Sequence, residues 1–229
     1  MRKLLIAIVI VMLTVNTVFA TTLLDVRTRV RAYLHETDTT NSTWTDAQVT
    51  QAVNAAQDYI TNALPASCHY NLITKKAQAM TPSQSTYALP ADFKSIISVR
   101  HWANTDTPLI QLTPINYLTG SYKATTKDPA YFIMGTDINV YPAPTLNQQM
   151  DYLYMKQPTR LSGDSDVVTL LTIYDEALVI AASLHLLSMD NQKDRASAVK
   201  AYLDLQLANI AEFFYNSNIV EPKRQKAGN

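Results

Sequence analysis

The sequence predicts an α+β fold, a helical bundle of two N-terminal and two C-terminal helices with an inserted antiparallel β module. Apolar residues recur at helical spacing near both ends of the chain, whereas short β-compatible runs bounded by glycine and proline fill the middle, from Thr86 to Lys156. These patterns divide the chain into five segments: a signal-like hydrophobic segment (1–20), N-terminal helices (21–66), a β module (67–160), C-terminal helices (161–216) and a flexible C-terminal arm (217–229).

The first twenty residues have the pattern of a secretory signal. Arg2 and Lys3 precede an unbroken apolar run from Leu4 to Leu13, and Val18-Phe-Ala20 places small side chains where a signal peptidase reads them. A membrane anchor is a second interpretation, because residues 4–24 carry no charge. A shorter chain that starts at Met12 is a third.

Two helices are predicted before Pro65. Thr22-Leu-Leu-Asp25 and Thr45-Asp-Ala-Gln48 are capping boxes, in which the threonine hydroxyl accepts a free backbone N–H. The first helix is expected to end near Glu36, with three arginines off its apolar stripe: Arg27, Arg29 and Arg31. The inward stripe of the second helix is Val49, Val53, Ala56 and Ile60.

The centre of the β module is predicted to be a hairpin. Tyr131–Met134 and Ile138–Tyr141 flank Gly135-Thr-Asp137, which suits a tight turn, and two prolines end the second strand. Leu89-Pro-Ala-Asp-Phe93 is expected to turn into a strand that packs against this hairpin. Further strands are predicted at Ser95–Trp102, Leu109–Leu112 and Met150–Met155, for about five or six in all.

After the β module, the run from Ile173 to Met189 is apolar on nearly every side. Such a helix is buried, and at this length it is short for a membrane span. A last helix has an apolar stripe that ends at Phe214, and the polar tail that follows has too few apolar residues to fold alone.

Composition and motifs argue against an enzyme or a nucleic-acid reader. Nineteen basic and nineteen acidic side chains cancel, so the charge field typical of nucleic-acid binders is missing. Cys68 is the only cysteine, and it and His69 are expected to point to opposite faces of an extended chain. The four histidines lack metal-ligand spacing. We therefore predict no catalytic residue, no metal site and no cofactor, and interpret the thirteen tyrosines as strand aromatics and subunit contacts.

Seven segments, in this order, carry a resemblance to a known family. They are Leu23–Leu34, Trp44–Gln57, Tyr87–Phe93, Asp128–Phe132, Ile138–Pro144, Tyr152–Pro158 and Tyr174–Leu178, and they span about residues 23–214. Together they resemble the head-to-tail adaptor (connector or ring) proteins of tailed bacteriophages.

The resemblance implies a structural virion protein that acts through the shape of its assembly. Such a protein forms a homo-oligomeric ring, usually a dodecamer, between the portal protein and the tail or nozzle proteins. It is assembled in the host cytoplasm, sits at the head–tail junction, and lines a channel through which double-stranded DNA passes without sequence specificity.

The resemblance also implies that a terminal arm reaches the portal. The expected anchors are Phe213, Phe214, Tyr215, Ile219 and Val220, with Lys223, Arg224 and Lys226 pairing with portal carboxylates or facing the DNA channel. The alternative, which rests on residues 1–20 alone, is an exported periplasmic or surface binding protein with a cleaved signal peptide.

Overall fold

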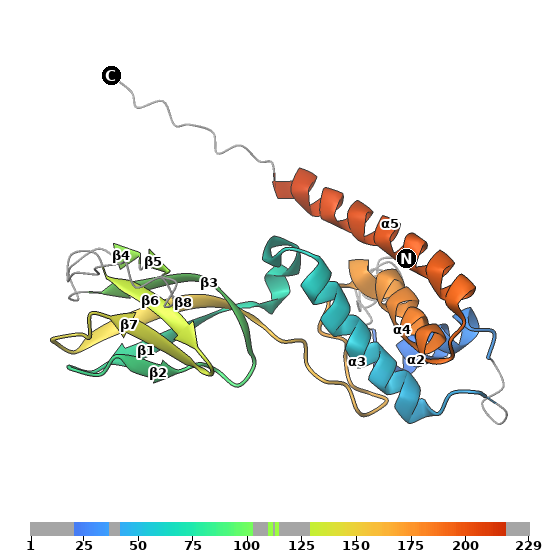
Figure 1. The fold of residues 1–229 in the computed structure, drawn as a ribbon, viewed down its shortest axis with the longest axis horizontal. Helices are drawn as coiled ribbons and strands as arrows, with labels where there is room; N and C mark the ends of the chain where they lie inside the picture. Colours follow the sequence, from blue (N-terminus) through green and yellow to red (C-terminus); the bar gives the residue numbers. More distant parts are fainter. Residues whose placement is uncertain (1–20, 37–41, 103–109, 112, 115–128, 219–229) are drawn as a thin grey trace, which may run out of the picture.

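The computed structural model describes residues 21–36, 42–102, 110–111, 113–114 and 129–218, and it confirms the predicted α+β class (Figure 1). Helices from both ends of the chain gather at one end of the molecule, and the β module lies at the other. The arm residues Ile219, Val220, Lys223, Arg224 and Lys226, like the signal-like segment 1–20, lie outside the described residues.

Helices α2 (Leu23–Tyr33) and α3 (Asp46–Ala63) begin at the two predicted capping boxes. The backbone N–H of Asp25 donates to Thr22 Oγ1 over 3.3 Å, and the Thr22 N–H donates back to the Asp25 carboxylate over 3.0 Å. Helix α2 ends three residues before the predicted Glu36, because His35 adopts a left-handed conformation with φ of +63°. Helix α3 ends before Pro65, since an extended Leu64 must precede the proline ring.

The expectation that the arginines of α2 lie off its buried face is wrong for two of the three. Arg27 and Arg31 are 8% and 7% exposed. Arg31 Nη2 donates to the Trp44 carbonyl over 2.9 Å and to Asp46 Oδ1 over 2.7 Å. Arg27 pairs with Asp164 from the loop that follows the β module. Arg27 is therefore buried beside a partner from a distant part of the sequence, and Arg31 is buried beside the start of α3.

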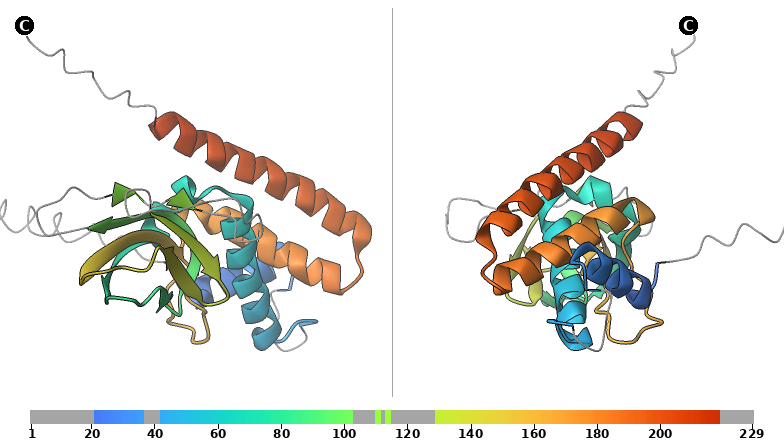
Figure 2. Two further views of the ribbon diagram at one scale, coloured as in Figure 1. Left: turned by 60° about the vertical axis from the view of Figure 1, so that its left-hand side comes forward. Right: turned by 90° about the vertical axis from the view of Figure 1, so that its right-hand side faces the viewer.

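Helix α4 (Asp175–Met189), preceded by the 3₁₀ turn η3 (Thr172–Tyr174), is the centre of the helical layer and contacts α2, α3 and α5 (Lys193–Asn218). Figure 2 shows α5 along the outside of the layer, over α4. Within the described residues, Thr172–Met189 is the one helical stretch long and apolar enough to cross a membrane. More than half of this stretch is buried against the neighbouring helices, in agreement with the prediction of a buried helix.

The β module begins after a 3₁₀ segment, η1 (Ala66–Leu72), and forms two four-stranded sheets. One sheet has the order β1-β8-β3-β4 and is antiparallel, and the other has the order β2-β7-β6-β5, with β5 and β6 parallel. The strands are β1 (Ile73–Met80), β2 (Thr86–Ala88), β3 (Phe93–Trp102), β4 (Ile110–Gln111), β5 (Thr113–Pro114), β6 (Ala130–Met134), β7 (Asp137–Tyr141) and β8 (Gln148–Lys156).

The predicted hairpin is present as β6 and β7. Met134 pairs with Asp137, so the turn consists of Gly135 and Thr136, and Gly135 has a φ of +61° that favours glycine. The predicted turn before β3 also forms, with the Phe93 N–H donating to the Pro90 carbonyl over 3.0 Å. Strands β1 and β2 were not predicted, so the described residues contain more strands than expected.

The residues that the structure describes form two cores. One lies between the helices, and the other lies between the two sheets and includes Tyr131, Ile138, Met150 and Tyr152. Segment 157–171 returns the chain to the helices, where the Asn54 side chain donates to the Leu161 carbonyl and accepts from its N–H, both over 2.9 Å. These two hydrogen bonds hold the segment that follows the β module against α3.

Candidate functional site

The C-terminal end of α5 presents an aromatic surface. Successive helix positions point in different directions, so the three neighbours Phe213, Phe214 and Tyr215 have different environments. Phe213 and Tyr215 are 56% and 70% exposed, whereas Phe214 is buried. The Phe214 ring stacks on Tyr174 with centroids 6.2 Å apart and meets Tyr70 edge-on at 6.3 Å. Phe214 therefore anchors the end of α5 in the helical core, and its two neighbours face outward.

Tyr70 was not identified from the sequence, yet it belongs to the same surface. It lies on η1, about 140 positions from Phe214 in the chain, and is 60% exposed. No local pattern marks it, because its role depends on α5 packing beside η1. Of the predicted arm anchors, the structure places Phe213, Phe214 and Tyr215 here.

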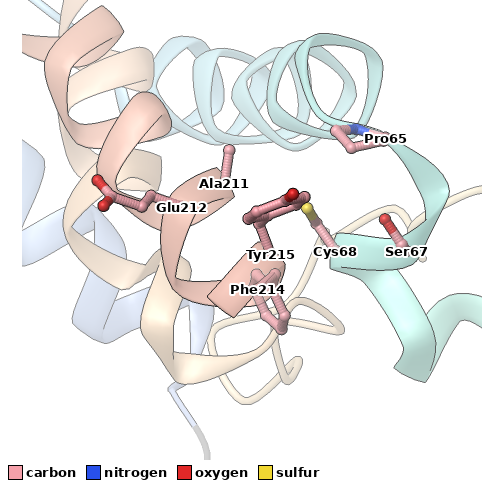
Figure 3. A pocket seen from close by; sticks show the side chains of 7 residues that line it. All are labelled: Pro65, Ser67, Cys68, Ala211, Glu212, Phe214 and Tyr215. Atoms are coloured by element: carbon pink, nitrogen blue, oxygen red, sulfur yellow. The ribbon is translucent and has the colours of Figure 1, made fainter. Parts of the chain in front are cut away.

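A groove of about 540 Å³ separates this end of α5 from η1, and we call it the α5–η1 groove (Figure 3). In Figure 3, Cys68 and Tyr215 lie close together at its centre, while the Glu212 carboxylate points away from Cys68. Its surface is mainly apolar, which favours contact with another apolar segment. The lining residues are Pro65, Ser67, Cys68, Ala211, Glu212, Phe214 and Tyr215.

Cys68 and His69 do not form a nucleophile and base. They lie in η1, not on the extended chain expected from the sequence, and both are buried. Burial raises the pKa of the Cys68 thiol, which keeps it protonated and unreactive. Burial, with the charge of Lys94 second, lowers the pKa of His69 to about 4, so the imidazole is neutral at pH 7. In the part of the chain that the structure describes, no three His, Cys, Asp or Glu side chains are placed to hold a metal ion.

A second surface lies on α5, on the side opposite α4. Ala198, Ala201, Leu205 and Ala208 are exposed at spacings of three and four residues, so they form a stripe on one face of the helix. Leu205 is 56% exposed and Tyr202, beside the stripe, is 41% exposed. We call this set, with Tyr202, the outer stripe of α5. An α-helix with an apolar face on both sides is typical of a helix that packs against two neighbours.

The β module exposes apolar side chains as well. Met134 at the β6–β7 turn and Leu146 in the loop before β8 are each 57% exposed, and Tyr141 at the end of β7 is 51% exposed. These side chains project from the module, not from the helical layer. Tyr141 and Leu146 lie at the end of the module away from the helical layer, whereas Met134 lies at the end nearer the helices. The molecule therefore has separate candidate contact surfaces at its two ends.

A buried helix wrapped by others, a β sandwich and several exposed apolar surfaces are typical of a protein that binds other proteins. The chain matches the family model of the SU10 adaptor protein over residues 21–220. It therefore belongs to the SU10 adaptor protein family, a family of phage head-to-tail adaptors, and the resemblance seen in the sequence is confirmed. No curated protein matches the chain.

Membership of this family makes the protein a phage virion component that interacts with other head and tail components. An adaptor is a structural protein, which agrees with the expectation that the chain is not an enzyme.

Proposed function

We propose that the protein forms a closed ring at the head–tail junction, between portal and tail, and that the ring lines the channel for double-stranded DNA. The observation that carries the proposal is the outer stripe of α5. It is a long helix face that this chain leaves uncovered in the described residues, and its small side chains allow another helix to approach closely. A neighbouring copy that packs there repeats the contact by rotation, and repeated contacts close a ring when that rotation divides a full turn.

The β module provides the second contact of each copy. Tyr141 and Leu146 are exposed at and after the end of β7, and the β7–β8 loop lies at the end of the module away from the helical layer (Figure 1), where a tail or nozzle protein can bind without competing with ring contacts. The module is also held by its own core, so binding there does not require the helices to open.

The third contact is the arm, which we propose binds the portal. Phe213 and Tyr215 are exposed at its base, and Ile219, Val220, Lys223, Arg224 and Lys226 follow in the sequence. Phe214 supports this contact from the core by fixing the direction of the last turn of α5. An arm that orders on binding covers a wide portal surface, and its exposed ion pairs each contribute about 0.2–1 kcal/mol.

The ring is tested by substitution in the outer stripe. Leu205→Asp places a charge in the stripe and is expected to prevent closed rings, as measured by light scattering and electron microscopy with and without portal. Leu24→Asp, a matched change at an exposed leucine of α2, is the control. Rings of Leu205→Asp equal in number and size to those of the parent would refute the assignment of this face.

The arm is tested by deleting residues 219–229. The truncated protein is expected to stay folded, because both cores lie within residues 21–218, but to lose portal attachment, so that packaged heads leak DNA. Full portal binding and normal infectious particles would contradict the proposal.

The signal-like segment supports a second candidate, an exported periplasmic or surface binding protein. The family match begins at residue 21 and does not include this segment. Intact-mass measurement of the protein from purified virions distinguishes the two. The adaptor assembled in the cytoplasm is expected to start at Met1 or Met12, whereas a chain that starts at Thr21 in exported material without virions would favour export.

A further inference from the structure

The α5–η1 groove has the size and surface of a binding site for a short apolar segment. Its volume of about 540 Å³ lies within the range of small-molecule and side-chain pockets. One wall comes from α5 and the other from the corner between α3 and η1, so the walls are held by two different elements (Figure 3). Phe214 reaches the groove from the core side and is fixed by Tyr174, which gives the groove a rigid base.

The chain itself continues from this place with a matching segment. Helix α5 ends at Asn218, only three residues after Tyr215 in the groove wall, and the next two residues are Ile219 and Val220. Pro222 follows and does not allow the helix to continue through the residues just before it. A turn in the chain directly after α5 is therefore compatible with the sequence.

The remaining length allows that segment to turn back into the groove. The α5 side of the groove extends from Tyr215 to Ala211, which is about 6 Å along a helix axis. Ile219 and Val220 are the first two residues after Asn218 and span up to about 7 Å, whereas Tyr215 lies about 4.5 Å before Asn218 along the helix axis. A chain that reverses directly after α5 therefore brings them to the Tyr215 end of the groove.

Charge and tethering favour the same occupant. Glu212 lies at the rim of the groove, and Lys223, Arg224 and Lys226 follow the apolar pair within six residues. A segment tethered by a few residues has an effective concentration near the millimolar range, so it occupies the groove before a free segment of similar affinity does.

We propose that Ile219 and Val220 of the same chain occupy the α5–η1 groove in the free protein, with the following basic residues beside Glu212. The groove stores the arm until a stronger partner displaces it. The binding of Ile219 and Val220 in the groove does not depend on the portal. The idea that this binding delays portal attachment rests on the proposed function.

The test is the binding of a fluorescent peptide of residues 217–229 to the full-length chain, followed by anisotropy without portal. The variant Ile219→Asp/Val220→Asp is expected to release the tethered segment and to bind the peptide about tenfold more tightly than the parent does, because the groove is then free. Adding Tyr215→Ala to this variant is expected to abolish peptide binding. Tyr59→Ala, an exposed tyrosine of α3 outside the groove, is the matched control and is expected to leave binding unchanged.

Equal peptide binding by parent and variant, or binding that does not depend on Tyr215, would overturn the proposal, provided thermal melting shows all variants folded. Light scattering distinguishes a groove filled by the tail of the same chain from a groove filled by the tail of a second copy. Oligomers of the parent that dissociate in Ile219→Asp/Val220→Asp would place the segment in a neighbour's groove and also overturn it. Because no portal is present, a failed portal-binding experiment leaves this result unaffected.

Discussion

The buried histidine His69 predicts how the stability of the protein depends on pH. Its side chain is fully buried, its ring lies 5.2 Å from that of Tyr174, and neither ring nitrogen makes a well-aligned hydrogen bond. Burial is the main reason that its pKa is lowered from 6.5 to about 4, and the charge of Lys94 adds to it. Between these two values the unfolded chain binds a proton that the folded chain does not bind. Stability is therefore lost as pH falls from about 6.5 towards 4.

The magnitude follows from the two pKa values. A difference of one pKa unit corresponds to about 1.4 kcal/mol, so the step from 6.5 to about 4 is worth about 3 kcal/mol in the free energy of unfolding. His69→Phe keeps an aromatic ring beside Tyr174 and removes the ring nitrogens that bind a proton. The variant is expected to lack this loss and to differ from the parent by about 1 kcal/mol at pH 7.

Urea unfolding at pH 7, 6, 5 and 4 measures the effect. Carboxylates also titrate towards pH 4, but they are common to parent and variant, so the difference between the two curves isolates His69. Parallel curves for the two proteins over the whole range would refute the reasoning and show that the imidazole is hydrated or paired.

Three further changes test the packing. Tyr131→Ala is expected to cost about 3 kcal/mol in urea unfolding, because the ring is 5% exposed between the two sheets, and unchanged stability would show that the sandwich is misassigned. Phe93→Ala is expected to cost about half as much, since this ring is only half-buried where it stacks on Tyr154, and a cost equal to that of Tyr131→Ala would contradict that position. Arg31→Met is expected to cost about 1–2 kcal/mol and to return the pKa of Asp46, lowered mainly by the Arg31 hydrogen bond, to its ordinary range in an NMR titration. A pKa of Asp46 that does not move would assign its shift to another cause.

Features that depend on neighbouring residues were predictable from the sequence. A capping box needs only four consecutive positions, so the starts of α2 and α3 followed from Thr22 and Thr45. The β6–β7 hairpin followed from Gly135 in the same way. Strand β1 could not be predicted from the sequence. It is an edge strand that carries Lys75, Lys76 and Gln78 and shows little alternation of apolar residues.

Features that depend on distant residues were not predictable. Arg27 is buried because Asp164, over a hundred positions away, pairs with it, and a helical wheel contains no such information. The candidate site shows the same division. The aromatic residues at the end of α5 were found as a cluster in the sequence, but only the packing against Tyr70 and Tyr174 separates buried Phe214 from its exposed neighbours.

The pairing of β1 with β8 has a consequence for how such adaptors diversify. Ile73 lies opposite Met155, so the chain leaves the helical layer and comes back to it at adjacent points. A segment with neighbouring ends can be exchanged for another fold, or shortened to a tight turn, without changing the length or spacing of the helices. We expect that a chimera with a foreign sandwich between residues 72 and 156 would keep the same helical frame and acquire a different tail specificity. The β module, which selects the tail partner, and the helical layer would then evolve independently within one chain.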